Sequence, residues 1–106
     1  MNLKDFIQEP KLVEITLDDD AIIERYGGPI KFWAYDHIQL SQYFKFFDTR
    51  IQGQYDELET ITRSLIRNED GSQLIPEGKT LPSDIFASAI VALGNLLGKS
   101  QSKAST

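Results

Sequence analysis

The chain has 106 residues, no cysteine and a formal net charge of −5 at pH 7. This length fits one small domain with a modest core, and the lack of cysteine excludes disulfides, thiolate metal sites and a cysteine nucleophile. The negative charge excludes most nucleic-acid binders, because binding to phosphate backbones depends on clustered cations.

The first half of the chain predicts a small β-hairpin. Residues 12–17 are apolar and partly β-branched, as in a short strand. Residues 30–35 alternate, which places Ile30, Phe32 and Ala34 on one face of a second strand. Because a two-stranded hairpin is marginally stable by itself, we expect it to pack on helices.

The segment between the two predicted strands carries helix-capping signals. Residues 18–20 are three aspartates, which interrupt the strand and offer an N-cap to a short helix that ends near Tyr26. Gly27 and Pro29 follow as stop signals. The three acids lack the spacing of a calcium loop, so no metal site is predicted here.

The first of three predicted amphipathic helices follows the hairpin. Asp36 and Gln39 have the spacing of a capping box, so we expect the helix to begin there. Phe46 is a surplus aromatic residue and a candidate for partner binding, with contact to the hairpin or a loop of the same chain as the alternative. The inward face is predicted from the apolar stripe, which consists of Leu40, Tyr43, Phe44, Phe47 and Ile51.

The second predicted helix begins after Gly53 and carries Leu58, Ile61 and Leu65 on its inward face. Residues 68–71 form a strong turn signal, and a loop is expected up to Lys79.

The last predicted helix contains a run without any charged side chain, residues 85–98. This run is too short to cross a bilayer, which needs about 20 apolar residues, so no membrane contact is expected. Pro82 and Asp84 suit the first turn of a helix that ends near Leu97, and its wide apolar face predicts the main core. We predict a partner-binding surface on its back face, with burial by its own chain as the alternative, at the small neutral residues Ala87, Val91, Gly94 and Asn95.

Catalysis is not predicted. His37 is the only histidine, and Asp36 beside it could orient the ring for acid–base chemistry. No serine or threonine nucleophile lies in a recognisable motif, so we expect a non-enzymatic protein without a cofactor.

These elements predict an α+β, mainly α, fold in which a short N-terminal β-hairpin packs on three amphipathic helices. Residues 1–98 form the predicted domain. Residues 99–106 are small and polar and are predicted to be a flexible tail.

The layout carries a family resemblance. A β-rich start and a helical middle are followed by the turn at 68–71, the apolar pair Leu74 and Ile75, and Leu-Pro-Ser-Asp-Ile at 81–85, which opens the last helix. In this order of elements, over most of the chain, the protein resembles tail assembly chaperones of long-tailed bacteriophages. The local matches are short, so no residue receives a family role.

The resemblance implies a non-enzymatic protein of the host cytoplasm that forms homo-oligomers. Such proteins coat the tape measure protein until tail tube subunits polymerise around it, and many also exist in a longer frameshifted form. A structural virion component, such as a small tail or baseplate subunit, is the alternative within the same class. An acidic host-interaction protein is the alternative from another class.

Overall fold

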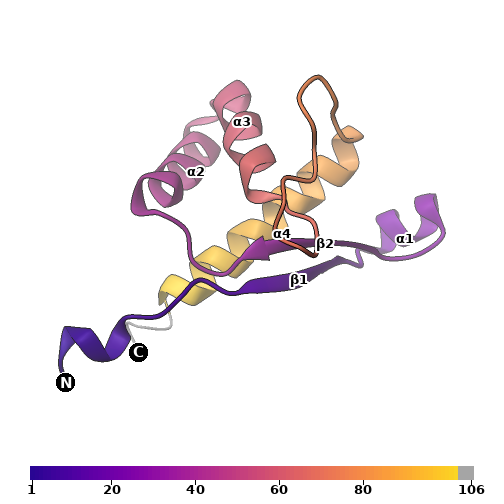
Figure 1. Ribbon diagram of the computed structural model, residues 1–106. Helices are drawn as coiled ribbons and strands as arrows, with labels where there is room; N and C mark the ends of the chain where they lie inside the picture. The colour runs from indigo at the N-terminus through magenta and orange to yellow at the C-terminus, as the bar shows by residue number, and fades with distance from the viewer. Residues whose placement is uncertain (103–106) are drawn as a thin grey trace.

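The computed structural model describes the backbone of residues 1–102 and the side chains of residues 1–98. The predicted α+β, mainly α, class is confirmed: a two-stranded antiparallel hairpin is combined with helices (Figure 1). The elements in chain order are the 3-10 turn η1 (Leu3–Phe6), strand β1 (Leu12–Leu17), helix α1 (Asp20–Tyr26), strand β2 (Ile30–Tyr35) and helices α2 (Leu40–Gln52), α3 (Tyr55–Leu65) and α4 (Ser83–Ser102).

The end of α4 differs from the expectation. The sequence predicts a helix end near Leu97, whereas the helical backbone continues to Ser102. Residues 103–106 of the predicted tail lie outside the described residues.

The hairpin turns its predicted face toward the core. Ile15 pairs with Phe32 and Leu17 with Ile30 in an antiparallel register. Phe32 and Ala34 are buried, whereas Lys31 before them is exposed and Trp33 between them is half-buried. Alternation along each strand therefore directs one face of the hairpin into the core.

The free edge of β2 is covered by a residue that follows the end of α3. The N–H of Trp33 donates to the carbonyl of Arg67 at 3.0 Å, and the N–H of Arg67 donates to the carbonyl of Trp33 at 2.7 Å. Arg67 also forms an antiparallel β-bridge with Gln73. The sheet is thus wider than two strands at this point, which supports a hairpin that would be marginal alone.

Helix α1 replaces a tight turn between the strands and is attached to the start of α4. Gly27 ends α1 in the left-handed conformation, with φ of 85°. Asp19 lies at the predicted N-cap position, but its carboxylate accepts a bond from the Ser88 hydroxyl at 2.5 Å instead of capping the helix. The Tyr26 hydroxyl donates to Asp84 at 2.8 Å, and this bond lowers the pKa of Asp84 and raises that of Tyr26.

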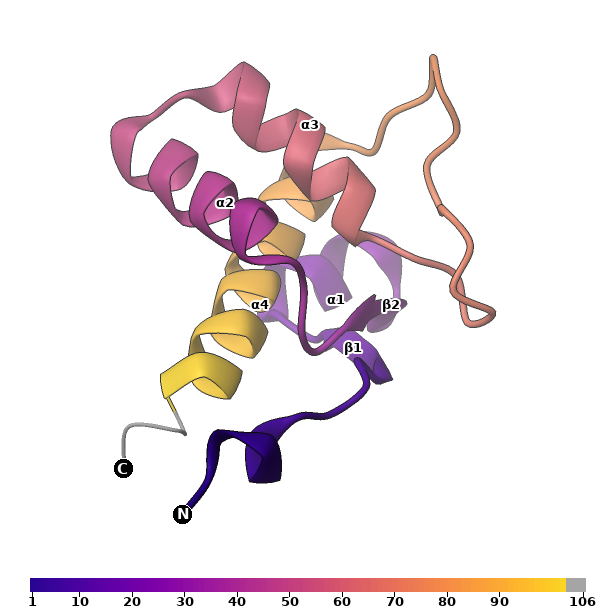
Figure 2. The ribbon, with the colours of Figure 1, turned by 60° about the vertical axis from the view of Figure 1, so that its left-hand side comes forward.

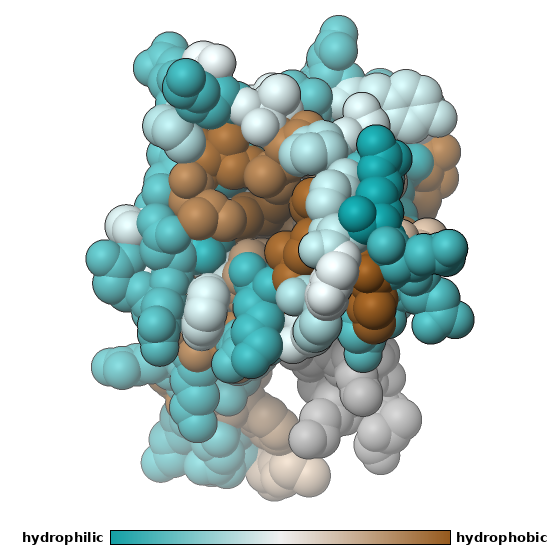
Figure 3. All heavy atoms as spheres, turned by 90° about the vertical axis from the view of Figure 1, so that its right-hand side faces the viewer, coloured by the Kyte–Doolittle hydropathy of each residue, from teal (hydrophilic) through white to brown (hydrophobic). Residues whose placement is uncertain are grey.

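The core lies around α4, which contacts both the hairpin and α2 (Figures 1 and 2). Its wide apolar face is buried or partly buried against the core, as predicted. On the side of the molecule that bears α1, the surface is mostly hydrophilic and apolar side chains lie mainly in hollows (Figure 3). The largest fully buried side chains are Phe46, Thr62, Ile66, Leu93 and Leu97.

Helix α2 begins later than predicted. It starts at Leu40 with Gln39 as its N-cap residue, so the predicted capping box from Asp36 to Gln39 is wrong. The Asp36 carboxylate accepts a bond from the N–H of Lys11 at 2.8 Å. The backbone N–H of Lys11, just before β1, therefore binds the carboxylate that the sequence pattern assigned to helix capping.

The inward face of α2 also differs from the prediction. Phe46, expected to be a surplus aromatic, is 0% exposed, and Thr49 one turn further on is buried as well. The physical reason is a close approach to α4. A Cβ atom at Gly94 would lie 3.8 Å from the Phe46 ring, and a Cβ atom at Gly98 would lie 3.9 Å from the Phe47 ring.

We predict that Gly94 tolerates alanine but not leucine. Alanine displaces only the flexible guanidinium of Arg50, and its better helix propensity is worth about 1 kcal/mol. Leucine would press on the Phe46 ring and should lower the free energy of unfolding by about 1–3 kcal/mol. Denaturant unfolding of both variants measures the difference, and a Gly94→Leu variant as stable as Gly94→Ala would contradict the close approach.

Two buried threonines make a matched pair for a second prediction. The Thr49 hydroxyl donates to the Lys45 carbonyl at 2.6 Å, whereas the Thr62 hydroxyl has no partner among the described residues. A buried hydroxyl without a partner is unfavourable by about 1–3 kcal/mol. Thr62→Val should therefore leave stability unchanged or raise it by about 1 kcal/mol, and Thr49→Val should lower it by about 0.5–1.5 kcal/mol in urea unfolding.

Candidate protein-binding surface

Helix α2 carries an apolar stripe on its outer side. We call Leu40, Tyr43, Phe44, Phe47 and Ile51 the α2 stripe; these are the residues that the periodicity assigned to the core. Leu40, Phe44 and Ile51 are 68%, 52% and 81% exposed, respectively. The prediction that these three residues point inward is wrong, because α2 buries Phe46 and Thr49 instead. Tyr43 and Phe47 are partly buried and pack against the core, as predicted.

Ring contacts join the α2 stripe to the core. The Tyr43 ring lies 5.7 Å from that of Phe44 and 4.8 Å from that of Phe47. Phe47 in turn meets the buried Phe46 edge-on, with ring centroids 5.2 Å apart. Such edge and tilted contacts are the preferred aromatic geometries, so the stripe is a preformed surface supported from beneath.

The surroundings of the α2 stripe are polar and of mixed charge. Lys45, Asp48 and Arg50 are exposed on α2, whereas the stripe itself is uncharged. Tyr55 is 75% exposed at the start of α3, and its hydroxyl lies close to Gly53 at the end of α2. A contiguous apolar surface with a polar rim is typical of a protein-binding site.

The predicted surface on α4 is only partly accessible. Ala87, Val91 and Asn95 are exposed, with Val91 at 49%, and their role stays a prediction. Gly94 is buried beneath Arg50 and Phe46. The small size of Gly94 therefore allows the close approach of α2 of the same chain. Phe46 is buried too, and neither it nor Gly94 is available to a partner.

A cleft of about 370 Å³ lies between the β2–α2 connection and the end of α3. The Arg67 guanidinium at its wall donates to the carbonyls of Ser64 at 3.0 Å and Gly71 at 3.2 Å. Pro10 lies at the cleft as well. The side chains that form most of its lining are Tyr35, His37, Ile38, Gln42, Leu65 and Arg67. Simple periodicity could not find this cleft, since its walls come from three separate segments.

His37 joins two segments at the edge of this cleft. Its Nδ1 lies 2.9 Å from the Asp36 carboxylate, and its Nε2 lies 2.8 Å from the amide nitrogen of Gln8. Both contacts fit a ring that donates from Nδ1 and accepts at Nε2. Among the side chains of residues 1–98, no group of three or more His, Asp or Glu could hold a metal ion.

Asp36 is held in its charged form. Burial by itself raises the pKa of Asp36, but hydrogen bonds from the N–H of Lys11 and from His37 outweigh it, so the pKa lies below its ordinary value. The stabilisation is therefore complete above the unfolded-state pKa, about 3.9, and is lost as the pH falls through the folded-state pKa.

We predict a loss of stability in acid that depends on Asp36. The free energy of unfolding of the wild type should fall below about pH 4. Asp36→Asn should be less stable at pH 7 by about 1 kcal/mol and should show a shallower fall. Asp70 and Asp84, whose pKa values are also lowered, account for the remaining slope. Urea unfolding from pH 2.5 to 7 measures both curves, and parallel slopes would contradict the assignment.

No helix within residues 1–102 is both long enough and apolar enough to cross a membrane. Comparison of the chain with protein-family models, with curated proteins and with solved structures found no match.

Proposed function

We propose that this protein is a non-enzymatic assembly chaperone that binds an apolar helical segment of another protein through the α2 stripe. The observation that carries the proposal is the outward orientation of the stripe, with Leu40, Phe44 and Ile51 exposed on a helix whose opposite side is packed. Full burial of a large apolar side chain is favourable by about 1.5–3 kcal/mol, and the exposed side chains do not gain this free energy in the monomer. A binding partner would recover this free energy.

The geometry of the α2 stripe suits a partner helix. From Leu40 to Ile51 the stripe extends over about 16 Å of helix axis, and its residues recur at helical spacing, as in helix-to-helix recognition. The exposed Phe44 ring offers the kind of aromatic anchor that dominates interfaces. The net charge of −5 favours a partner segment with basic residues beside its apolar face.

We propose the tape measure protein of a long-tailed phage as this partner, in the host cytoplasm. Support comes from the layout resemblance to tail assembly chaperones and from the fit of the α2 stripe to a long apolar helix. Homo-oligomers of the chaperone would cover successive segments of the tape measure protein. Tail tube subunits would then replace the chaperone as they polymerise.

The deciding experiment places a charge on the α2 stripe. Phe44→Glu should keep its fold, since the ring is 52% exposed, and should bind a purified tape measure fragment at least tenfold more weakly in titration calorimetry. Val91→Glu puts the same charge on a comparably exposed site of α4 and should bind as the wild type does. Unchanged binding by Phe44→Glu would refute the proposal, and loss by Val91→Glu alone would assign binding to α4.

A further inference from the structure

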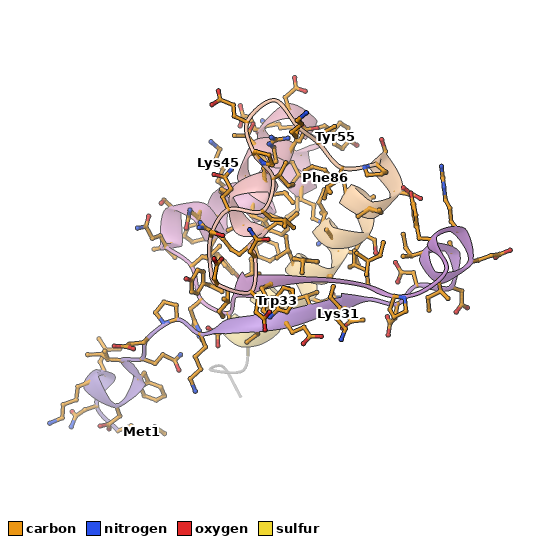
Figure 4. All side chains as sticks on the ribbon, turned by 45° about the vertical axis from the view of Figure 1, so that its right-hand side comes forward. Met1, Lys31, Trp33, Lys45, Tyr55 and Phe86 are labelled. Carbon is orange, nitrogen blue, oxygen red and sulfur yellow. The ribbon has the colours of Figure 1, made fainter. Side chains whose placement is uncertain are left out.

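The first ten residues form an arm that stands away from the rest of the molecule (Figures 1 and 2). We call residues 1–10 the N-terminal arm; all of them are exposed. Met1 lies at its tip, far from the sheet (Figure 4). Its apolar residues Leu3, Phe6 and Ile7 are 86%, 54% and 80% exposed, respectively, so the arm carries apolar surface that the monomer leaves largely unburied.

The N-terminal arm is locally ordered in spite of its exposure. The N–H of Asn2 donates to the Asp5 carboxylate at 3.1 Å, and the N–H of Asp5 donates to the carbonyl of Asn2 at 3.0 Å. This reciprocal pair closes the turn η1. The arm therefore presents Leu3 and Phe6 on a small folded knob.

The root of the arm lies at the cleft between the β2–α2 connection and α3. Gln8 bonds to His37, a cleft residue, and Pro10 lines the cleft itself. Ile7 is extended, with ψ of 126°, and Glu9 is biased toward extended conformations because a proline follows it. The segment that leaves the cleft therefore points the knob away from its own body.

The cleft has the size and lining to hold the apolar side chains of such a knob. A cavity of about 150 Å³ accepts one benzene ring, so a volume of about 370 Å³ has room for about two groups of that size. Tyr35, Ile38 and Leu65 supply apolar surface, and Gln42 is one of its polar groups. Leu3 together with Phe6 matches this volume.

We propose that the N-terminal arm of one copy occupies this cleft in a second copy, and that the exchange is reciprocal. Each chain carries the arm and its receptor side by side. A single two-fold axis near Pro10 can therefore fill both clefts and cover both arms at once, which closes the assembly as a dimer. The cleft uses the side of α2 that bears Gln42, about 160° around the helix from Phe44, so this contact is independent of the proposed function.

The first test is the oligomeric state as a function of concentration. In sedimentation equilibrium the wild type should form a dimer, and Phe6→Ser should weaken it by about tenfold to a hundredfold. The control Ile23→Ser changes an exposed apolar residue on α1 and should keep the wild-type dimer. Thermal unfolding at low concentration should be nearly the same for Phe6→Ser and the wild type, because Phe6 is exposed and lies outside the core. A monomeric wild type, or a Phe6→Ser variant with an unweakened dimer, would overturn the proposal.

The second test locates the arm by cross-linking. The chain has no cysteine of its own, so Lys4→Cys on the arm and Gln42→Cys in the cleft are unique sites. Mixing the two single variants under mild oxidation should give a disulfide between different chains. A double variant that cross-links only within one chain would show that the arm closes on its own body, and no cross-link at all would also refute the exchange. Phe44→Glu should leave the cross-link intact, which separates failure here from failure of the chaperone proposal.

Discussion

The close approach of α2 to α4 governs the arrangement of this small domain. Gly94 and Gly98 have no side chains, so the rings of Phe46 and Phe47 lie directly against the surface of α4. Once the Phe46 ring is buried there, the rotation of α2 about its axis is set. Leu40, Phe44 and Ile51 of the α2 stripe must then face solvent, and their exposure follows from helix packing rather than from composition.

A second set of contacts fixes the β2–α2 connection and the segment after α3. Arg67 pairs with β2 through its backbone and binds two carbonyls through its side chain. Asp36 and His37 join the β2–α2 connection to the segment before β1. The cleft lies between these fixed points. Its walls come from elements that hydrogen bonds hold in place, so the cleft is preformed, as the proposed arm exchange requires.

The two proposed contacts use different sides of one helix and are therefore compatible. In the proposed function, the α2 stripe binds an apolar helix of a partner, while arm exchange pairs two copies through the cleft. A dimer built in this way would present two stripes to one extended partner. Binding through two linked sites strengthens attachment without any new contact, provided that both can be engaged at once.

The sequence by itself determined the local structure. Alternation set the facing of β2, Gly27 and Gly53 ended their helices in the left-handed conformation, and the wide apolar face of α4 was recognised because most of it is buried whichever neighbour it meets. Only the tertiary structure decided which side of α2 faces inward, because periodicity shows that a stripe exists but not what covers it. The same limit applies to Asp36, whose carboxylate binds a backbone N–H 25 residues away in the chain. It applies to the predicted site as well: Gly94 does admit a neighbouring helix, and only packing shows that this helix belongs to the same chain.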